Sequence, residues 1–252
     1  MIFNNIRLGL VLICFGFALS STHIYAKSKV LKSKKDVPHL LELFTSEGCS
    51  SCPPADDWYV DLKKHGKAFI DYIPVAYHVD YWNYIGWTDV FSSPRLSNLQ
   101  RSYARIWKSS TVATPSIVLN GKLWRGWRSN SLPPKVKIDG QGKLSVHLDG
   151  DGNGKVVFKG LKTGMVLKAH IAVLGLGIKR HIKAGENAGR TLKHEFVALS
   201  HQTIPLVAKQ KKYSKNFSYQ LKSPSPLKAY AIAIWIREAG SLKPLQAVGS
   251  YL

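Results

Sequence analysis

Apolar residues in the first half of the chain recur with the periods of strands and helices in alternation. Leu40–Phe44 (LLELF) and Ala68–Ala76 (AFIDYIPVA) are short apolar runs typical of buried strands. Ala55–Lys64 and Pro94–Lys108 carry apolar residues at helical spacing, and the serines before Pro94 are typical helix caps. The pattern therefore predicts two strands, each followed by a helix.

A hairpin is predicted after the second helix. Pro115–Leu119 predicts a strand, Asn120-Gly121 is a strong signal for a tight turn, and Lys122–Trp127 predicts the returning strand. Two strands joined by a helix favour parallel pairing, whereas a hairpin adds antiparallel strands. We therefore expect an α/β domain over residues 38–130, with a mixed sheet and flanking helices.

Beyond Pro133 and Pro134 the sequence pattern changes: short runs of residues with high β propensity alternate with turn residues. About seven such runs predict a separate C-terminal β-sandwich domain over residues 131–252. The predicted strands cover residues 143–149, 155–159, 165–176, 191–200, 216–222, 227–237 and 244–251.

The N-terminus has the features of a secretory signal peptide. A short region with Arg7 precedes the apolar stretch Leu8–Leu19, and small residues allow cleavage after Ala26. A bilayer span takes about 20 residues, so an uncleaved membrane anchor is the weaker alternative. We therefore expect a signal peptide over residues 1–26, a basic linker over residues 27–37 and export, most simply to the bacterial periplasm.

Positive charge is concentrated in the second half of the chain. The formal net charge is +21, and residues 131–252 contain 20 basic and 6 acidic residues, against 10 and 9 in residues 36–130. One interpretation is a solvated basic surface. The other is a docking face for an anionic partner, either an acidic protein or a membrane surface. Nucleic acid is not an expected partner of an exported protein.

Two cysteines lie between the first predicted strand and the first predicted helix. Cleavage would remove Cys14 and leave Cys49 and Cys52, where the N–H groups and dipole of a helix start stabilise a thiolate. A bridge across so short a loop restricts the unfolded chain little, and zinc would need two more ligands at suitable spacing. A redox-active dithiol is therefore favoured, with a structural pair and a metal site as alternatives.

Three sequence segments carry a family resemblance. The chain resembles thioredoxin-like proteins and, more narrowly, a family of secreted bacterial thioredoxin-like proteins of uncharacterised function. The resemblance covers residues 38–128 and extends to Gly185–His194. The segments are Phe44–Asp56 (FTSEGCSSCPPAD), Tyr77–Trp87 (YHVDYWNYIGW) and Ala113–Gly121 (ATPSIVLNG).

The resemblance implies a thioredoxin-like fold for the first domain and assigns roles to four residues. Cys49 would attack a substrate sulfur, and Cys52 would resolve the mixed disulfide. The Thr114–Pro115 bond would be cis, with Pro115 facing the cysteines and shaping the substrate groove.

The buried acid that thioredoxins carry six residues before the first cysteine is missing here. Leu43 occupies that position, and the neighbouring Glu42 is the candidate proton acceptor, unless it faces a wet edge of the sheet.

Polar and aromatic residues follow the second predicted strand, at the edge of the sheet where active sites gather. His78 and Asp80 are candidate supporting residues, because a histidine there could exchange protons with the cysteines; the alternative is a histidine that bonds to backbone. The aromatic residues after them predict either core packing or a wall of the substrate groove. They are Tyr81, Trp82, Tyr84 and Trp87.

These expectations favour an exported thiol–disulfide oxidoreductase that acts on protein or small-thiol substrates with no cofactor and no metal. The alternative is a non-catalytic thioredoxin-fold binding or assembly module, whose basic C-terminal domain docks an anionic partner.

Overall fold

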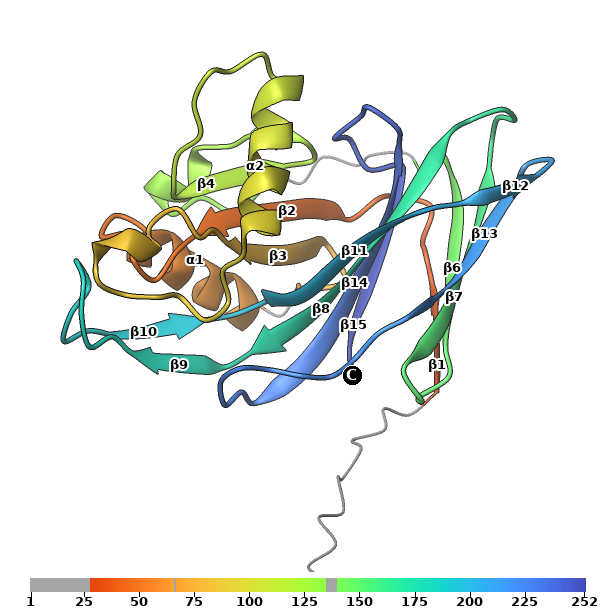
Figure 1. The fold of residues 1–252 in the computed structure, drawn as a ribbon. Helices are drawn as coiled ribbons and strands as arrows, with labels where there is room; N and C mark the ends of the chain where they lie inside the picture. Colours follow the sequence, from red (N-terminus) through yellow and green to blue (C-terminus); the bar gives the residue numbers. More distant parts are fainter. Residues whose placement is uncertain (1–27, 66, 135–139) are drawn as a thin grey trace, which may run out of the picture.

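The computed structural model describes residues 28–65, 67–134 and 140–252, and its strands form three sheets (Figure 1). The predicted signal peptide and Cys14 lie outside the described residues. Among the described helices, none has the length and hydrophobicity that crossing a bilayer requires.

The largest sheet has eight strands in the order β15-β14-β8-β11-β3-β2-β4-β5. The pairs β2–β3 and β3–β11 are parallel, and the other neighbours are antiparallel. Its strands are β2 (His39–Thr45), β3 (Tyr72–His78), β4 (Ser116–Leu119), β5 (Lys122–Leu123), β8 (Leu167–Leu176), β11 (Val197–Pro205), β14 (Ala229–Glu238) and β15 (Gln246–Tyr251).

The remaining strands form two smaller sheets. A five-stranded antiparallel sheet has the order β1-β6-β7-β13-β12, and β9 and β10 form a hairpin. These strands are β1 (Lys29–Lys32), β6 (Gly142–Leu148), β7 (Asn153–Gly160), β9 (Ile178–His181), β10 (Thr191–His194), β12 (Val207–Lys209) and β13 (Lys212–Ser218).

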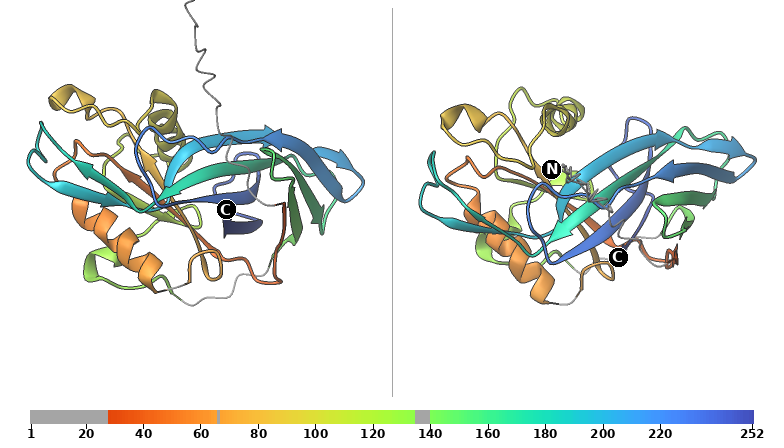
Figure 2. Two further views of the ribbon diagram at one scale, coloured as in Figure 1. Left: turned by 90° about the horizontal axis from the view of Figure 1, so that it is seen from below. Right: turned by 60° about the horizontal axis from the view of Figure 1, so that its bottom comes forward.

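Two α-helices lie on opposite faces of the β2–β3 end of the large sheet (Figure 2). Helix α1 (Pro53–Lys64) has its prolines in the first turn, where a missing N–H leaves no helical bond unmade. Helix α2 (Pro94–Ile106) is capped by Ser93, whose Oγ accepts a hydrogen bond from the Leu96 N–H at 3.4 Å. Short 3₁₀ turns, η1 (Asn83–Ile85) and η2 (Gly126–Ser129), lie in the connecting segments.

Strands β8 and β14 belong to two hydrophobic cores at once. In β14, Ala233 and Trp235 pack into the core that contains β2, β3, α1 and α2, whereas Ile234 and Ile236 pack against the five-stranded sheet. Such strands read as continuous apolar runs because both faces are buried. The two cores therefore share one sheet.

The predicted fold class, a thioredoxin-like α/β domain followed by a separate β-sandwich, is wrong. Among the described residues 43% are in strands and 15% in helices, and only two α-helices occur. The free edge of β3 pairs with β11, where the Ala76 N–H donates to the Phe196 carbonyl at 2.8 Å, so strands from both sides of residue 130 form one sheet. A free strand edge can pair with another strand, and the sequence pattern does not show which strand does so.

Local elements agree better with the expectations. The Asn120-Gly121 turn is confirmed, because both residues have positive φ and join β4 to β5. Residues 27–37 were expected to be a linker, but Lys29–Lys32 form β1 and pair with β6. The predicted strand 191–200 divides into β10 and β11 at Phe196, which has a φ of 57°.

Candidate functional site

Cys49 and Cys52 form a disulfide at the junction of β2 and α1, with their Cα atoms 5.4 Å apart. Cys52 is the N-cap residue of α1. The exposed fraction of Cys49 is 1%, whereas Ser50 and Ser51 between the cysteines are exposed. The disulfide is therefore covered by other parts of the chain.

The segment before β4 lies against Cys49. The Thr114–Pro115 peptide bond is cis, as the resemblance implied. The carbonyl oxygen of Thr114 lies 3.8 Å from Cys49 Sγ and accepts a hydrogen bond from Ser51 Oγ at 3.5 Å. The structure therefore brings the Thr114 carbonyl to Cys49, and Pro115 is the next residue along the chain.

Predicted groove residues hold this segment in place. Trp82 Nε1 donates to Thr114 Oγ1 at 2.8 Å, and Tyr81 donates through its hydroxyl to Gln100, whose Nε2 donates to the Ala113 carbonyl. Tyr81 and Trp82 are therefore partly buried supports of the segment that carries Pro115.

The other aromatic residues of this stretch behave differently. Tyr84 is 80% exposed, whereas Trp87 donates through Nε1 to Glu47 Oε2 at 2.8 Å. Trp87 thus supports the loop before Cys49.

Two predicted supporting residues point elsewhere. Glu42 is fully buried and accepts hydrogen bonds from the Tyr103 hydroxyl and from Arg237 Nη2, both at 2.6 Å. Asp80 contacts Ser97 of α2 through both its backbone N–H and its carboxylate. Glu42 therefore joins β2 to α2 and β14, and Asp80 joins the segment after β3 to α2.

His78 lies in a buried polar cluster beside the cysteines. Its Nδ1 is 2.6 Å from Asp89 Oδ2, and Asp89 also accepts from the backbone N–H groups of Glu47 and Phe91. Burial opposes the charge of Asp89, but His78 and these N–H groups outweigh it and lower the pKa of the carboxyl. His78 Nε2 has no hydrogen-bond partner.

A second buried histidine, His194 of β10, stands between two carboxylates. Its Nε2 is 3.5 Å from Glu47 Oε1, and its Nδ1 is 3.6 Å from Asp56 Oδ1. These separations fit ion pairs better than hydrogen bonds. Burial disfavours the charged ring, but the two carboxylates prevail and raise the pKa of His194 to about 10.

Asp56, His78 and His194 offer ligand atoms within 4.8 Å of one another. The set resembles a metal site in its donor types. However, the two carboxylates beside His194 raise its pKa to about 10, so a metal would have to displace a proton from this ring. We therefore interpret the group as a cluster that holds a proton.

The segment from β9 to β10 covers the cysteine loop. Asn187 Nδ2 donates to the carbonyls of Glu47 at 2.9 Å and Cys49 at 3.0 Å, and Glu186 accepts from the Ser50 N–H at 3.2 Å. Arg180 Nε donates to Glu47 Oε1 at 3.1 Å. Sequence reasoning assigned these residues no role, although Glu186, Asn187 and His194 lie within the resemblance segment Gly185–His194.

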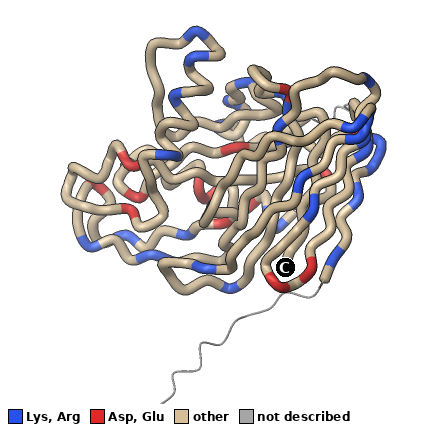
Figure 3. The backbone as a smooth tube through the Cα atoms, turned by 45° about the vertical axis from the view of Figure 1, so that its right-hand side comes forward, with Lys and Arg blue, Asp and Glu red and all other residues tan. Residues whose placement is uncertain are grey.

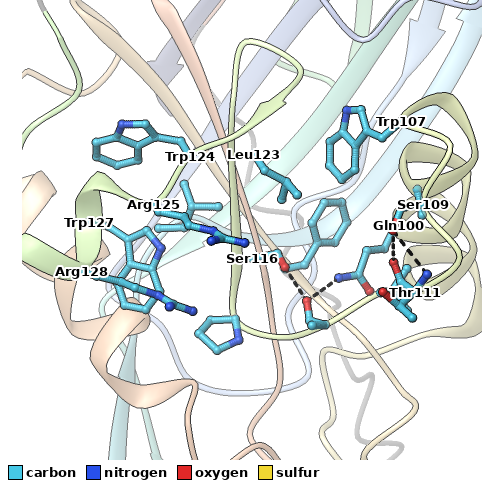
Figure 4. A pocket seen from close by; sticks show the side chains of 16 residues that line it. Gln100, Trp107, Ser109, Thr111, Ser116, Leu123, Trp124, Arg125, Trp127 and Arg128 are labelled. Carbon is cyan, nitrogen blue, oxygen red and sulfur yellow. Dashed lines mark hydrogen bonds between the residues drawn. The ribbon is translucent and has the colours of Figure 1, made fainter.

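A pocket of about 300 Å³ opens beside Pro115 (Figure 4). Its walls come from α2, the segment before β4, and the β5–η2 region. Trp124, Trp127, Arg125 and Arg128 lie on one side, and Trp107, Gln100, Ser109 and Thr111 lie on the other.

Fold and site together define a mostly β protein with a Cys-x-x-Cys disulfide at a strand–helix junction, covered by a β-hairpin. The chain belongs to the DUF1223 family, whose description is "Protein of unknown function". The family model matches residues 40–237. No curated protein matches the chain.

Two solved structures share the fold. One is the crystal structure of protein AGR_C_4864 from Agrobacterium tumefaciens, with 22% sequence identity and a TM-score of 0.58 over 87% of this chain and 96% of that one. The other is HBP35 of Porphyromonas gingivalis, with 12% identity and a TM-score of 0.58 over 87% of this chain and 76% of that one.

Proposed function

We propose that the chain is an exported thiol–disulfide oxidoreductase in which Cys49 attacks the substrate and Cys52 resolves the mixed disulfide. The observation that carries the proposal is the Cys49–Cys52 disulfide at the start of α1, with the Thr114 carbonyl 3.8 Å from Cys49 Sγ. In these two features the site is similar to thioredoxin-like proteins, and we extend that likeness to the site alone. Export is supported by the apolar stretch Leu8–Leu19.

The start of α1 favours thiolate chemistry. Pro53 and Pro54 occupy the first turn, and the positive end of the helix dipole points toward the cysteines. A thiolate is the nucleophile in exchange, so a position that stabilises it raises the reactive fraction at neutral pH.

The exchange balances without a cofactor. The Cys49 thiolate attacks one sulfur of a substrate disulfide, the substrate S–S bond breaks, and one half leaves as a thiolate. The Cys52 thiolate then attacks Cys49 Sγ, which releases the other half as a thiolate and forms the Cys49–Cys52 disulfide. The substrate gains two electrons and the cysteine pair loses two; the reverse sequence oxidises a dithiol.

The buried cluster supplies a proton acceptor for Cys52. Asp56 lies four residues after Cys52, so the two side chains share one face of the helix. Its carboxylate accepts from Thr45 Oγ1 at 3.0 Å and is paired with His194. Asp56 takes the role that the sequence suggested for Glu42.

Reduction of insulin disulfides by dithiothreitol tests the activity. The protein should accelerate it, and Cys49→Ser should abolish the acceleration. Ser50→Ala, which changes an exposed neighbour and leaves both sulfurs in place, should retain it. Equal rates with Cys49→Ser and the unchanged protein would refute the proposal.

One observation favours the second candidate, a binding module for an anionic partner. Cross-strand neighbours in the five-stranded sheet align four exposed lysines, Lys143, Lys159, Lys212 and Lys209, and Figure 3 shows basic positions gathered on these strands. Like charges placed opposite each other destabilise a sheet. Lysines protect edge strands, which explains Lys209 but not Lys143 and Lys159 on interior strands.

Sedimentation with vesicles tests this candidate. Binding to vesicles that contain anionic phospholipid, lost on replacing these four lysines by Glu and retained in Cys49→Ser/Cys52→Ser, would support it. Equal sedimentation with neutral and anionic vesicles would count against it.

A further inference from the structure

The pocket beside Pro115 combines aromatic walls with positive charge. Its aromatic lining includes Trp107, Trp124 and Trp127, and its charged lining consists of Arg125 and Arg128 with no Asp or Glu. The guanidinium of Arg128 lies 5.5 Å from the centre of the Trp127 ring. A pocket of this composition attracts an anion that is attached to an apolar or planar group.

Both arginines are available for a ligand. They are exposed, and among the described residues neither forms an ion pair with an acid. In Figure 4 the side chains of Arg125 and Arg128 extend from the same wall toward the middle of the pocket. The planar guanidinium fork matches the two oxygens of a carboxylate.

The pocket adjoins the sulfur that would react. Thr114 contacts Cys49 through its carbonyl, and the next two residues, Pro115 and Ser116, line the pocket. Cys49 itself does not line the pocket, so the Thr114–Pro115 segment lies between the pocket and the sulfur. A substrate that placed its sulfur at Cys49 would have to extend across this segment to place another group in the pocket.

The burial of both cysteines limits the size of that substrate. Cys49 is 1% exposed and Cys52 is fully buried. Exchange requires direct access of one sulfur to another, so a narrow molecule reaches Cys49 more readily than a disulfide within a folded protein. A volume of about 300 Å³ also fits a small ligand.

We propose that the Trp-Arg pocket binds the carboxylate-bearing part of a low-molecular-weight thiol or disulfide whose sulfur reacts at Cys49. The inference rests on the proposed oxidoreductase function and names its substrate class. Arg125 and Arg128 bind the carboxylate, the tryptophans cover the apolar part of the ligand, and Pro115 separates the carboxylate end from the sulfur end. The exchange itself follows the electron balance given above.

Reduction of three small disulfides with different charges tests the inference. The reduced protein is mixed with oxidised glutathione, which carries carboxylates, with bis(2-hydroxyethyl) disulfide, which is neutral, and with cystamine, which is cationic. Arg125→Gln/Arg128→Gln should lower the rate constant for oxidised glutathione about tenfold, because its carboxylates lose charged hydrogen bonds. The rate constant for the neutral disulfide should stay unchanged. Arg125→Lys/Arg128→Lys should restore part of the loss.

Lys32→Gln/Lys155→Gln is the matched control, since it removes two exposed positive charges from the five-stranded sheet, which does not line the pocket. It should leave all three rates unchanged. A second readout is calorimetric binding of oxidised glutathione to Cys49→Ser/Cys52→Ser, which should weaken about tenfold when the two arginines are replaced by Gln in that background.

The outcomes separate the two proposals. If no disulfide, small or in a protein, reacts with the reduced cysteines, the proposed function fails. If all three small disulfides react, and replacing the two arginines changes their three rate constants by the same factor, the function stands and the pocket assignment is overturned. Faster reaction with insulin than with oxidised glutathione would overturn the small-substrate assignment.

Discussion

His194 Nε2 lies 3.5 Å from Oε1 of Glu47, a residue two positions before Cys49. This contact joins the β9–β10 hairpin to the cysteine loop and places a cation between Glu47 and Asp56 within the core. Glu47 and Asp56 are buried at 0% and 5% exposure, so their charges depend on such partners.

Replacing His194 should destabilise the protein in a pH-dependent way. Burial opposes the charge of His194, but the carboxylates raise its pKa to about 10, above the unfolded value near 6.5. The stability it contributes is therefore fully present below pH 6.5 and is lost as the pH rises toward 10. His194→Gln should cost roughly 3 kcal/mol at pH 6.5 in urea unfolding, and the difference should shrink toward pH 10.

His181→Gln on the same hairpin is the matched control, because His181 is exposed. It should change little at any pH. A cost of His194→Gln that stayed constant or grew between pH 6.5 and 10 would contradict the imidazolium assignment.

His201 should have the opposite pH dependence. Burial, followed by the positive charges of Arg95 and Arg237, lowers its pKa to about 3, and its ring stacks on those of His170 and Trp235 at 5.6 Å. The folded state keeps His201 neutral while the unfolded state binds a proton below pH 6.5, so stability is lost as the pH falls. His201→Phe keeps an aromatic ring but has no group that takes up a proton. At pH 4 it should therefore avoid roughly 3 kcal/mol of the loss in unfolding free energy that the unchanged protein shows on acidification.

Urea unfolding at pH 7 and pH 4 measures this difference. The exposed His147 supplies the control substitution His147→Phe, for which no recovery is expected. Equal acid sensitivity of His201→Phe and the unchanged protein would show that His201 takes up its proton without cost.

Glu42→Gln should affect folding but not exchange. The carboxylate forms a buried ion pair with Arg237, and one-sided removal of such a partner costs roughly 3–5 kcal/mol. Glu42→Leu/Arg237→Met removes both charges and should be much less destabilising. The exchange rate of folded Glu42→Gln should equal that of the unchanged protein; a large loss of rate would instead support the proton-acceptor role that the sequence suggested.

Asn187→Ala should loosen the cysteine loop. It leaves the buried Glu47 carbonyl without its Asn187 donor, and it leaves the Cys49 carbonyl with only the Cys52 N–H at 3.2 Å, which should cost about 2 kcal/mol of stability. Because the loop then opens more often, dithiothreitol should reduce the Cys49–Cys52 disulfide several-fold faster. Lys193→Ala, an exposed change on the same hairpin, should do neither, and equal reduction rates for all three proteins would refute the covering role of Asn187.

Local sequence patterns predicted the pieces of the fold better than their assembly. The signals that predicted α1, α2 and the β4–β5 hairpin are local. Each consists of an apolar period, a proline or serine at a helix start, or a turn dipeptide, all within a few residues of the element. The pairing of β11 with β3 joins segments far apart in the chain. The burial of both faces of β14 depends on two cores, to which different parts of the chain contribute. For that reason two domains were expected where one sheet runs through both.

The candidate site divides in the same way. The cysteines and Pro115 were recognised from short motifs. Glu42 was chosen because it lies next to the position of the usual acid, but strand alternation directs it to Arg237, and Asp56 occupies the face of α1 that carries Cys52. The partners His194, Arg180 and Asn187 come from a distant hairpin, and no spacing rule connects them to the cysteines.

The central claim is that Cys49 and Cys52 are a reversible redox pair, and its most direct test is equilibration in buffers of defined reduced and oxidised glutathione, followed by thiol trapping and mass measurement. We predict a single transition in which both thiols disappear together, and loss of that transition in Cys49→Ser and Cys52→Ser. A disulfide that stays unreduced, or thiols that stay unoxidised, across the whole range of buffers would contradict the account.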